Sequence, residues 1–287
     1  MTITRALRPA VAVAVLLGLA ACGERGRPEG QGAATAVVPA AAEGLVLRVE
    51  YVGGFVSPSA LAGRLPLVSV YADGRVISEG PVAAIYPGPA LPNVQEQDID
   101  QGAVQDLVDR ALAAGVAETS DLGTPPVADA PSTRITVVTA SETFVREAEA
   151  LFETPPDGNG LTAEQQAARA ELSDFLATLT DSTVSGQGSE PYVPEAVAAV
   201  VSPWSDPQDG LLQPEVPWPG PELPGGPTGG LPDVTCVTAD GDQAHALLAA
   251  AGPATAATPW VTADGARWSV TFRPLLPDEF GCADLSD

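Results

Sequence analysis

Residues 65–80 read LPLVSVYADGRVISEG, the strongest β-hairpin signal in the chain. Two runs rich in β-branched residues flank Asp73 and Gly74. An Asp-Gly pair supplies the positive φ angles that a two-residue type I′ turn needs, so the stretch predicts an antiparallel hairpin. A second Asp-Gly pair lies within residues 258–272, TPWVTADGARWSVTF, and predicts a second hairpin.

Further strands surround the first hairpin. In residues 45–51, LVLRVEY, apolar and charged residues alternate, which predicts a half-buried strand with the odd-numbered residues from Leu45 to Tyr51 on one face. Residues 133–148 predict another strand pair. The short run EAVAAVVS, from Glu195 to Ser202, predicts one more element whose type the pattern leaves open.

Two amphipathic helices accompany these strands. Apolar residues recur at helical spacing from Val104 to Leu112, and Asp98 or Asp100 can cap the start of that helix. A second helix follows Thr162, which forms a capping box with Gln165. The order of elements predicts an α+β fold, in which antiparallel sheet is packed by a few helices and long loops are rich in proline and glycine.

The last third of the chain differs in composition. Residues 203–232 are about half proline and glycine, yet they contain Trp204 and Trp218, which predicts an extended segment docked on the fold. Residues 232–287 then predict a small β-α-β-β unit, with a helix capped by Asp240.

Charge excludes some classes of partner. The chain has 287 residues, a formal net charge of −24 and 13 basic residues, all of them arginine. No basic stripe is present that could neutralise phosphates, so we expect no binding to nucleic acid. The acidic residues are dispersed, which is typical of a solvated surface.

The amino terminus predicts export. Arg5 and Arg8 precede an apolar run, Ala10–Ala20, that is too short to cross roughly 30 Å of hydrocarbon and fits the core of a signal peptide. The following residues, Leu19-Ala20-Ala21-Cys22, resemble the lipobox of bacterial lipoproteins. The resemblance implies that residues 1–21 are removed and that the thiol of Cys22 receives a diacylglyceryl group, which anchors the protein to a membrane. An ordinary signal peptide that leaves Cys22 as a free thiol is the alternative.

The cysteine count agrees with this interpretation. Three cysteines are an odd number for a secreted chain. If Cys22 carries a lipid, Cys236 and Cys282 remain as a disulfide pair in an oxidising compartment. Two cysteines and one distant histidine make a poor zinc set, so we expect no metal. The chain as a whole loosely resembles uncharacterised actinobacterial lipoproteins.

These patterns divide the chain into five parts: a signal peptide (1–21), a flexible tether (22–43), an α+β domain (44–182), a proline- and glycine-rich connecting segment (183–231) and the β-α-β-β unit closed by a disulfide (232–287), either separate or part of the same domain.

No catalytic motif is present. The sequence lacks the nucleophile elbow, the phosphate-binding loop, the zinc-protease motif and the dinucleotide fingerprint. The single histidine, His245, lies beside an apolar helix stripe with no partner singled out by spacing. Glu96, Asp98 and Asp100 could supply a carboxylate pair, although helix capping explains at least one of them.

Aromatic residues in loop-like settings are the better functional lead. Tyr51, Phe55, Tyr86 and Trp218 lie next to glycine and proline and could present a rigid binding surface, or fill the edges of the core.

We therefore expect a membrane-anchored, extracytoplasmic lipoprotein without cofactor or catalytic activity, acting as a binding or envelope-structural module for an envelope protein or polysaccharide. The alternatives are an envelope hydrolase with a carboxylate pair and an accessory subunit of an envelope complex.

Overall fold

The computed structural model describes residues 44–154, 160–184, 188–228 and 234–285, which lie in one compact unit, Ala36–Asp287. The expected signal peptide, the tether and Cys22 lie outside the described residues. Within the described ranges the chain forms 13 strands and four α-helices in two sheets that are mainly antiparallel. The predicted α+β class is confirmed.

The elements follow one another in this order: β1 (Leu45–Val52), α1 (Pro58–Ala62), β2 (Val68–Tyr71), β3 (Arg75–Glu79), β4 (Val94–Asp98), α2 (Gln101–Ala113), β5 (Ser132–Val138), β6 (Thr143–Glu149), α3 (Ala163–Val184), β7 (Glu190–Pro191), β8 (Ala196–Pro203), β9 (Val216–Pro217), β10 (Gly226–Pro227), β11 (Thr235–Asp240), α4 (Gly241–Ala251), β12 (Trp260–Val261), β13 (Arg267–Pro274) and the 3₁₀ helix η1 (Cys282–Leu285).

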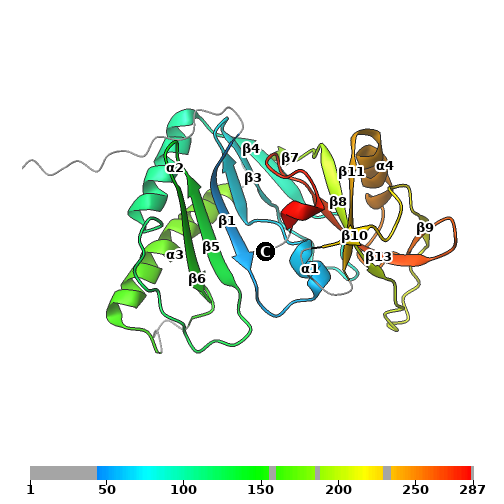
Figure 1. Cartoon of the computed structure of the whole chain (residues 1–287), viewed down its shortest axis with the longest axis horizontal. Coiled ribbons are helices and arrows are strands. Elements are labelled where there is room, and N and C mark those ends of the chain that lie inside the picture. The colour runs from blue at the N-terminus through cyan, green and yellow to red at the C-terminus, as the bar shows by residue number, and fades with distance from the viewer. Residues whose placement is uncertain (1–43, 155–159, 185–187, 229–233, 286–287) are drawn as a thin grey trace, which may run out of the picture. The chain divides into compact units, whose positions relative to one another are not determined.

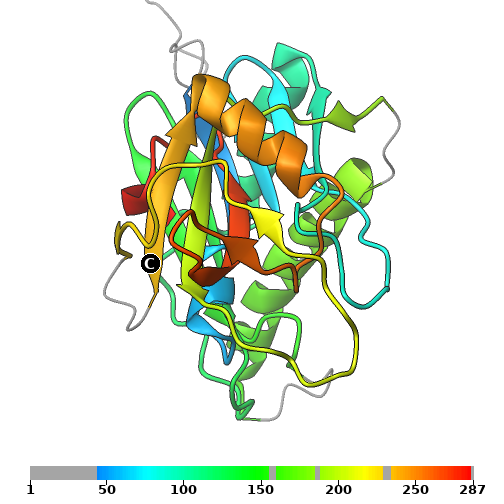
Figure 2. The ribbon, with the colours of Figure 1, turned by 90° about the vertical axis from the view of Figure 1, so that its right-hand side faces the viewer.

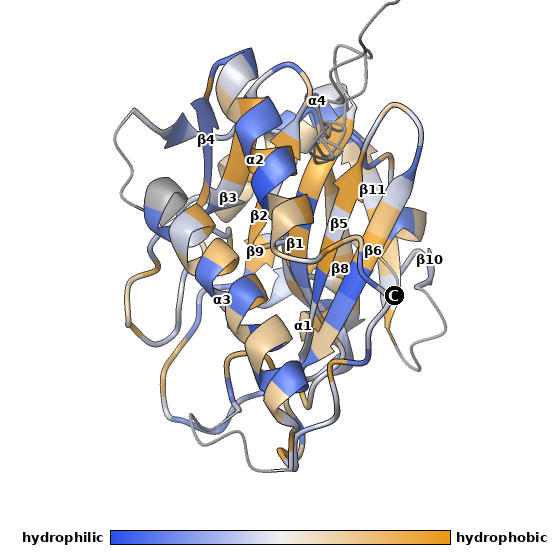
Figure 3. Cartoon of the chain, turned by 90° about the vertical axis from the view of Figure 1, so that its left-hand side faces the viewer, coloured by the Kyte–Doolittle hydropathy of each residue, from blue (hydrophilic) through white to orange (hydrophobic). Residues whose placement is uncertain are grey.

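The first sheet has seven strands in the order β6-β5-β1-β2-β3-β4-β7. Helices α2 and α3 cover one face of it, as Figures 1 and 3 show. Their apolar stripes, which include Val104, Val108, Leu172 and Leu176, pack against the buried side chains of the central strands. Both helices begin as the sequence predicts: the Asp100 carboxylate accepts a hydrogen bond from the amide of Ala103, and Thr162 and Gln165 form the capping box.

The second sheet has six strands in the order β10-β11-β8-β13-β12-β9, and α4 covers its outer face (Figure 2). Trp260 and Phe272 are almost fully buried there, with ring centroids 5.3 Å apart. Trp218 packs edge-on against Trp260 at 5.7 Å, and its indole N–H donates to the carbonyl of Pro221. The proline-rich segment is therefore docked on the fold through its tryptophan, as predicted.

The connecting segment supplies a central strand. β8, which contains the run AVAAVV, lies between β11 and β13 and pairs antiparallel with both. Its side chains are buried on both faces, so the run shows no alternation of apolar and polar residues. The strands of residues 232–287 are thus joined into one sheet by a strand that precedes them.

The inner faces of the two sheets are turned toward each other. Small apolar clusters lie between them, among them Ala198, Val200 and Cys236 from the second sheet and Tyr71 and Ile77 from the first. The segment after β13, residues 275–285, runs between the sheets and ends in η1 (red in Figure 1).

The two hairpins form, but with a different turn from the one expected. Gly74 has φ +102° and Gly265 has φ +85°, whereas neither Asp73 nor Asp264 has a positive φ angle, as a type I′ turn requires. The amide of each glycine donates to the residue three positions earlier, at 3.0 and 2.8 Å. The turns are therefore three-residue loops that close on a left-handed glycine.

A bulge in β1 corrects a second expectation. The pairing with β2 shifts between Leu45 and Leu47, so that Val46 is an extra residue. Val46, Leu47 and Val49 face the helices, whereas Leu45 packs in the inner cluster with Tyr71. The prediction that Leu45 shares a face with Leu47 is wrong. One inserted residue in a strand moves the side chains that precede it to the opposite face of the sheet.

The two turn glycines make a matched test. A Cβ on Gly74 would lie 2.3 Å from the carbonyl oxygen of Ile99, whereas a Cβ on Gly265 would meet nothing within 4 Å. Both positions have positive φ, so we expect Gly265→Ala to cost about 1 kcal/mol of unfolding free energy and Gly74→Ala about 3 kcal/mol. Urea unfolding measures both variants, and equal losses would contradict the close approach at Gly74.

Candidate functional site

Charged side chains lie between the sheets, where an apolar core is usual. Arg48 and Glu50 come from the inner face of β1, because they alternate with the residues that face the helices. Arg273 comes from β13, where it alternates with Phe272 of the opposite face. The segment that follows β13 brings Asp278 and Glu279 to these arginines.

The first contact is a three-membered network that ties the first sheet to the segment after β13. One carboxylate oxygen of Asp278 accepts a hydrogen bond from Arg48 Nη2 at 2.8 Å and from the Tyr71 hydroxyl at 2.7 Å. Burial and the Asp278 charge raise the pKa of Tyr71 far above its usual value, so the phenol stays protonated and donates. Burial is the largest single influence on the pKa of Arg48 and lowers it, but the charge and hydrogen bond of Asp278, together with Tyr71 and Glu279, outweigh burial, and the net shift is upward.

The second contact is a buried ion pair. Arg273 Nη2 lies 2.6 Å from Glu279 Oε1, and the two side chains are only 3% and 5% exposed. The second Glu279 oxygen accepts the amide of Leu276 at 2.7 Å, and Arg273 Nε donates to the carbonyl of Arg64 at 3.1 Å. Both charges are therefore hydrogen-bonded as well as paired, which a buried pair requires.

A disulfide fixes the end of the same segment. The sulfur atoms of Cys236, on the inner face of β11, and Cys282, at the start of η1, are 2.02 Å apart. The carboxylate of Asp284 accepts the amides of Phe280 and Gly281. The segment 275–285 is thus held at its start, middle and end.

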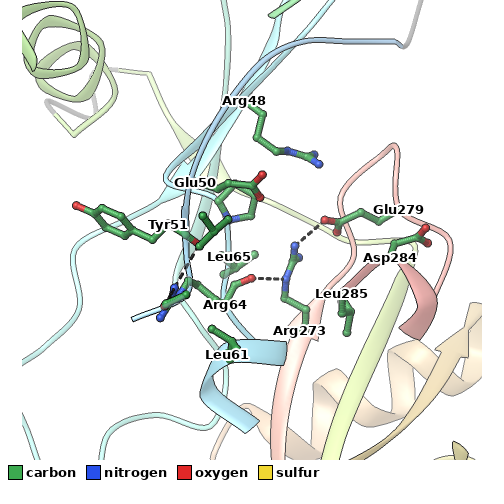
Figure 4. Close-up of a pocket in the computed structure, with 13 residues that line it drawn as sticks. Arg48, Glu50, Tyr51, Leu61, Arg64, Leu65, Arg273, Glu279, Asp284 and Leu285 are labelled. Atoms are coloured by element: carbon green, nitrogen blue, oxygen red, sulfur yellow. Dashed lines mark hydrogen bonds and ion pairs between the residues drawn. The ribbon is translucent and has the colours of Figure 1, made fainter. Parts of the chain in front are cut away.

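A small cavity of about 140 Å³ lies beside this network (Figure 4). Arg48, Arg64 and Arg273 line it together with Glu50, Glu279 and Asp284, so the charges of opposite sign are balanced. Arg64 Nη1 donates to the carbonyls of Tyr51 and Gly53, at 3.2 and 2.9 Å. Because each arginine is bound by protein groups, we interpret this cavity as part of the structural network.

A larger cavity, about 920 Å³, lies on the other side of the segment. It is formed by the turn between β2 and β3, the middle of β4, the end of β11, the start of α4 and residues from 192–196 and 275–280. This volume falls within the range of roughly 300–1,000 Å³ that is common for small-molecule sites. The lining combines carboxylates, one arginine, the single histidine and apolar groups: Asp73, Arg75, Glu96, Tyr192, Val193, Glu195, Ala196, Thr238, Asp240, Gly241, His245, Leu275, Leu276, Pro277, Glu279 and Phe280.

Carboxylates dominate the electrostatics of this cavity. Arg75 is paired with Asp73 at 2.7 Å, and Glu279 is paired with Arg273. Burial raises the pKa of Glu96, and burial with the Glu96 charge raises the pKa of Tyr192 to about 12. The Tyr192 hydroxyl is therefore protonated at neutral pH, and it donates to the carbonyl of Leu275 at 2.8 Å. The surplus of negative charge disfavours anionic ligands and suits groups that donate hydrogen bonds.

The start of α4 shows how local sequence shapes the site. Gly241 has φ +48°, which allows β11 to turn directly into the helix. Asp240 occupies the position before the helix, but its side chain makes no capping hydrogen bond. The predicted capping role of its carboxylate is therefore wrong, and Asp240 lines the cavity together with His245, which is exposed one turn into the helix.

Two exposed apolar residues belong to the cavity lining. Phe280 is 84% exposed and Val193 is 73% exposed, although apolar side chains of this size are usually covered. Phe280 is held by the turn before η1, where its amide donates to Asp284 at 2.7 Å. The backbone that carries this exposed ring is therefore fixed beside a polar cavity.

The four aromatic candidates do not form one surface. Tyr51 lines the small cavity, but its ring lies across β1 from Arg273 in Figure 4. Phe55 is 86% exposed in the loop after β1, and Tyr86 is exposed in the loop between β3 and β4. Trp218 packs in the second sheet.

The acidic residues that the sequence offered as a carboxylate pair do not lie together in one site either. Asp100 caps α2, whereas Glu96 lies on β4 and reaches the large cavity. The residues that the sequence analysis did not single out are Tyr192, Glu195 and Phe280. Neither their spacing nor a motif marks these residues as part of a site. The only local hint in the sequence is that Phe280 is an aromatic residue close to Cys282.

Metal and membrane sites were not found in the described ranges. No group of three or more His, Cys, Asp or Glu side chains there is arranged to hold a metal ion. None of the described helices has the length and hydropathy that a membrane span needs. No protein-family model, curated protein or solved structure matches the chain.

The buried pair can be tested against an exposed one. Removing the charge of Glu279 by Glu279→Gln leaves Arg273 buried without its counter-ion, which we expect to lower the unfolding free energy by about 3–5 kcal/mol. Glu215 also pairs with an arginine, Arg267, but both are about half exposed, so Glu215→Gln should cost less than about 1 kcal/mol. Chemical denaturation distinguishes the two variants, and similar losses would contradict a central role for the buried pair.

Proposed function

We propose that the protein is a lipoprotein, anchored through Cys22 to the extracytoplasmic side of a membrane, that binds an envelope saccharide without catalysis. The large cavity is the observation that carries the binding proposal. It offers carboxylates and the phenol oxygen of Tyr192 as acceptors for hydroxyl groups, and an exposed aromatic ring beside them. A sugar ring has hydroxyl groups around its rim and C–H groups on its faces, which this combination suits.

The anchor proposal rests on the sequence. The apolar run before Cys22 and the small residues Ala20 and Ala21 support processing and lipidation at this cysteine. The disulfide between the other two cysteines agrees with an oxidising compartment and accounts for both of them. The residues between Cys22 and Gly44 would then separate the binding cavity from the bilayer.

The proposed anchor predicts that replacing Cys22 abolishes lipid labelling and membrane association. The wild-type chain, expressed in an actinobacterium with an alkyne-tagged fatty acid, should carry the label and sediment with membranes. Cys22→Ala should lose both properties, because the thiol is the only attachment point proposed. A Cys236→Ser, Cys282→Ser double variant should keep the label. A labelled, membrane-bound Cys22→Ala variant would refute the anchor.

Ligand binding is tested with two exposed phenylalanines. Phe280 is 84% exposed in the cavity lining and Phe55 is 86% exposed outside it. In calorimetric titrations with oligosaccharides of glucose, mannose and N-acetylglucosamine, Phe280→Ala should weaken binding about tenfold, because a lost aromatic contact costs on the order of 1.4 kcal/mol. Phe55→Ala should leave binding unchanged.

Three results would count against this proposal. Equal affinities of the two phenylalanine variants would place the ligand elsewhere, and an absence of binding to all the oligosaccharides would refute the ligand class. Release of new reducing ends during incubation would assign the cavity to a hydrolase with Glu96 among the candidate acids.

A further inference from the structure

Two loops place large apolar side chains in solvent, outside both cavities. Residues 80–93 join β3 to β4, and residues 204–215 join β8 to β9. Ile85 and Tyr86 on the first loop are 63% and 68% exposed, and Leu211 and Leu212 on the second are 49% and 97% exposed. We call these four residues the apolar loop patch.

The carboxylate of Asp209 joins the two halves of the patch. One oxygen accepts the Tyr86 hydroxyl at 2.8 Å, and the other accepts the amide of Leu211 at 2.8 Å. These two hydrogen bonds lower the pKa of Asp209, so the carboxylate is charged. The two loops therefore meet at one ionised group.

Both loops are also fastened to the same turn, which follows α4. The amide of Ala90 donates to the carbonyl of Ala254, and the amide of Ala256 donates to the carbonyl of Gly88. Gln213, on the second loop, accepts the hydroxyl of Thr255 at 2.8 Å. The exposed side chains thus stand on a fixed support, which reduces the entropy lost when a surface docks on them.

The charges on the two loops decide what can cover the patch. Neither loop contains a basic residue, and the acidic residues are Asp206, Asp209 and Glu215. Glu215 is paired with Arg267, which leaves the other two beside the apolar side chains. An anionic bilayer would be repelled by these carboxylates, and a symmetric contact with a second copy would bring like charges together.

We propose that the apolar loop patch is an interface for a partner protein whose surface is apolar and carries arginine or lysine beside the apolar groups. Such a partner covers the four exposed side chains and neutralises Asp206 and Asp209. The patch is built from different residues than the large cavity, so this interface and saccharide binding are independent properties of the molecule.

A photo-reactive residue tests the patch in the full chain in living cells. The variant Leu212→p-benzoylphenylalanine keeps an apolar side chain at the patch, and the same replacement of Val145, which is 56% exposed on β6, is the control. After irradiation we expect one protein adduct from position 212 and none from position 145. The cross-linked partner peptide should contain basic residues next to apolar ones.

A second substitution tests the charge. Asp209→Asn, added to the position-212 variant, keeps an oxygen acceptor for Tyr86 but removes the negative charge, so the adduct should fall at least threefold. Phe280→Ala in the same background should leave the adduct unchanged, which separates this interface from the cavity. Lipid adducts, an adduct between two copies, an adduct insensitive to Asp209→Asn, or the absence of any adduct would overturn the proposal.

Discussion

The ion pair between Arg273 and Glu279 is the interaction on which the arrangement of the two sheets depends. Arg273 belongs to a strand of the second sheet, and its Nε donates to the carbonyl of Arg64, in the chain segment that links β1 and β2 of the first sheet. Glu279 belongs to the segment between the sheets. One guanidinium therefore fixes three pieces of chain that no strand ladder connects, and its burial means that either partner alone would be an uncompensated charge.

This constraint explains why the inner faces carry charged side chains among their apolar clusters. An apolar inner layer would hold two sheets together at many relative positions, because apolar contacts have little directional preference. The hydrogen bonds of Arg48, Tyr71 and Asp278 form at one position only. Glu279, which is paired with Arg273, also lines both cavities and so forms part of the wall between them.

Local chemistry made part of the fold predictable. The capping box at Thr162, the cap at Asp100 and the glycines of the two hairpins act within a few residues, so sequence alone locates them. The bulge at Val46 and the strand type of residues 196–203 depend on neighbours elsewhere in the chain. An all-apolar run that is buried on both faces has no period from which its structure can be read.

The large cavity lies beyond sequence reasoning for a related reason. Asp73, Tyr192, Asp240 and Phe280 reach it from four separate parts of the chain, and no sequence motif links them to one another. They meet because the segment after β13 returns between the sheets and is fastened there by its carboxylates and its disulfide. The composition of the cavity is therefore a consequence of tertiary topology. A chain that kept every local signal, but lost Glu279 or Cys282, would keep its helices and hairpins while losing one wall of the site.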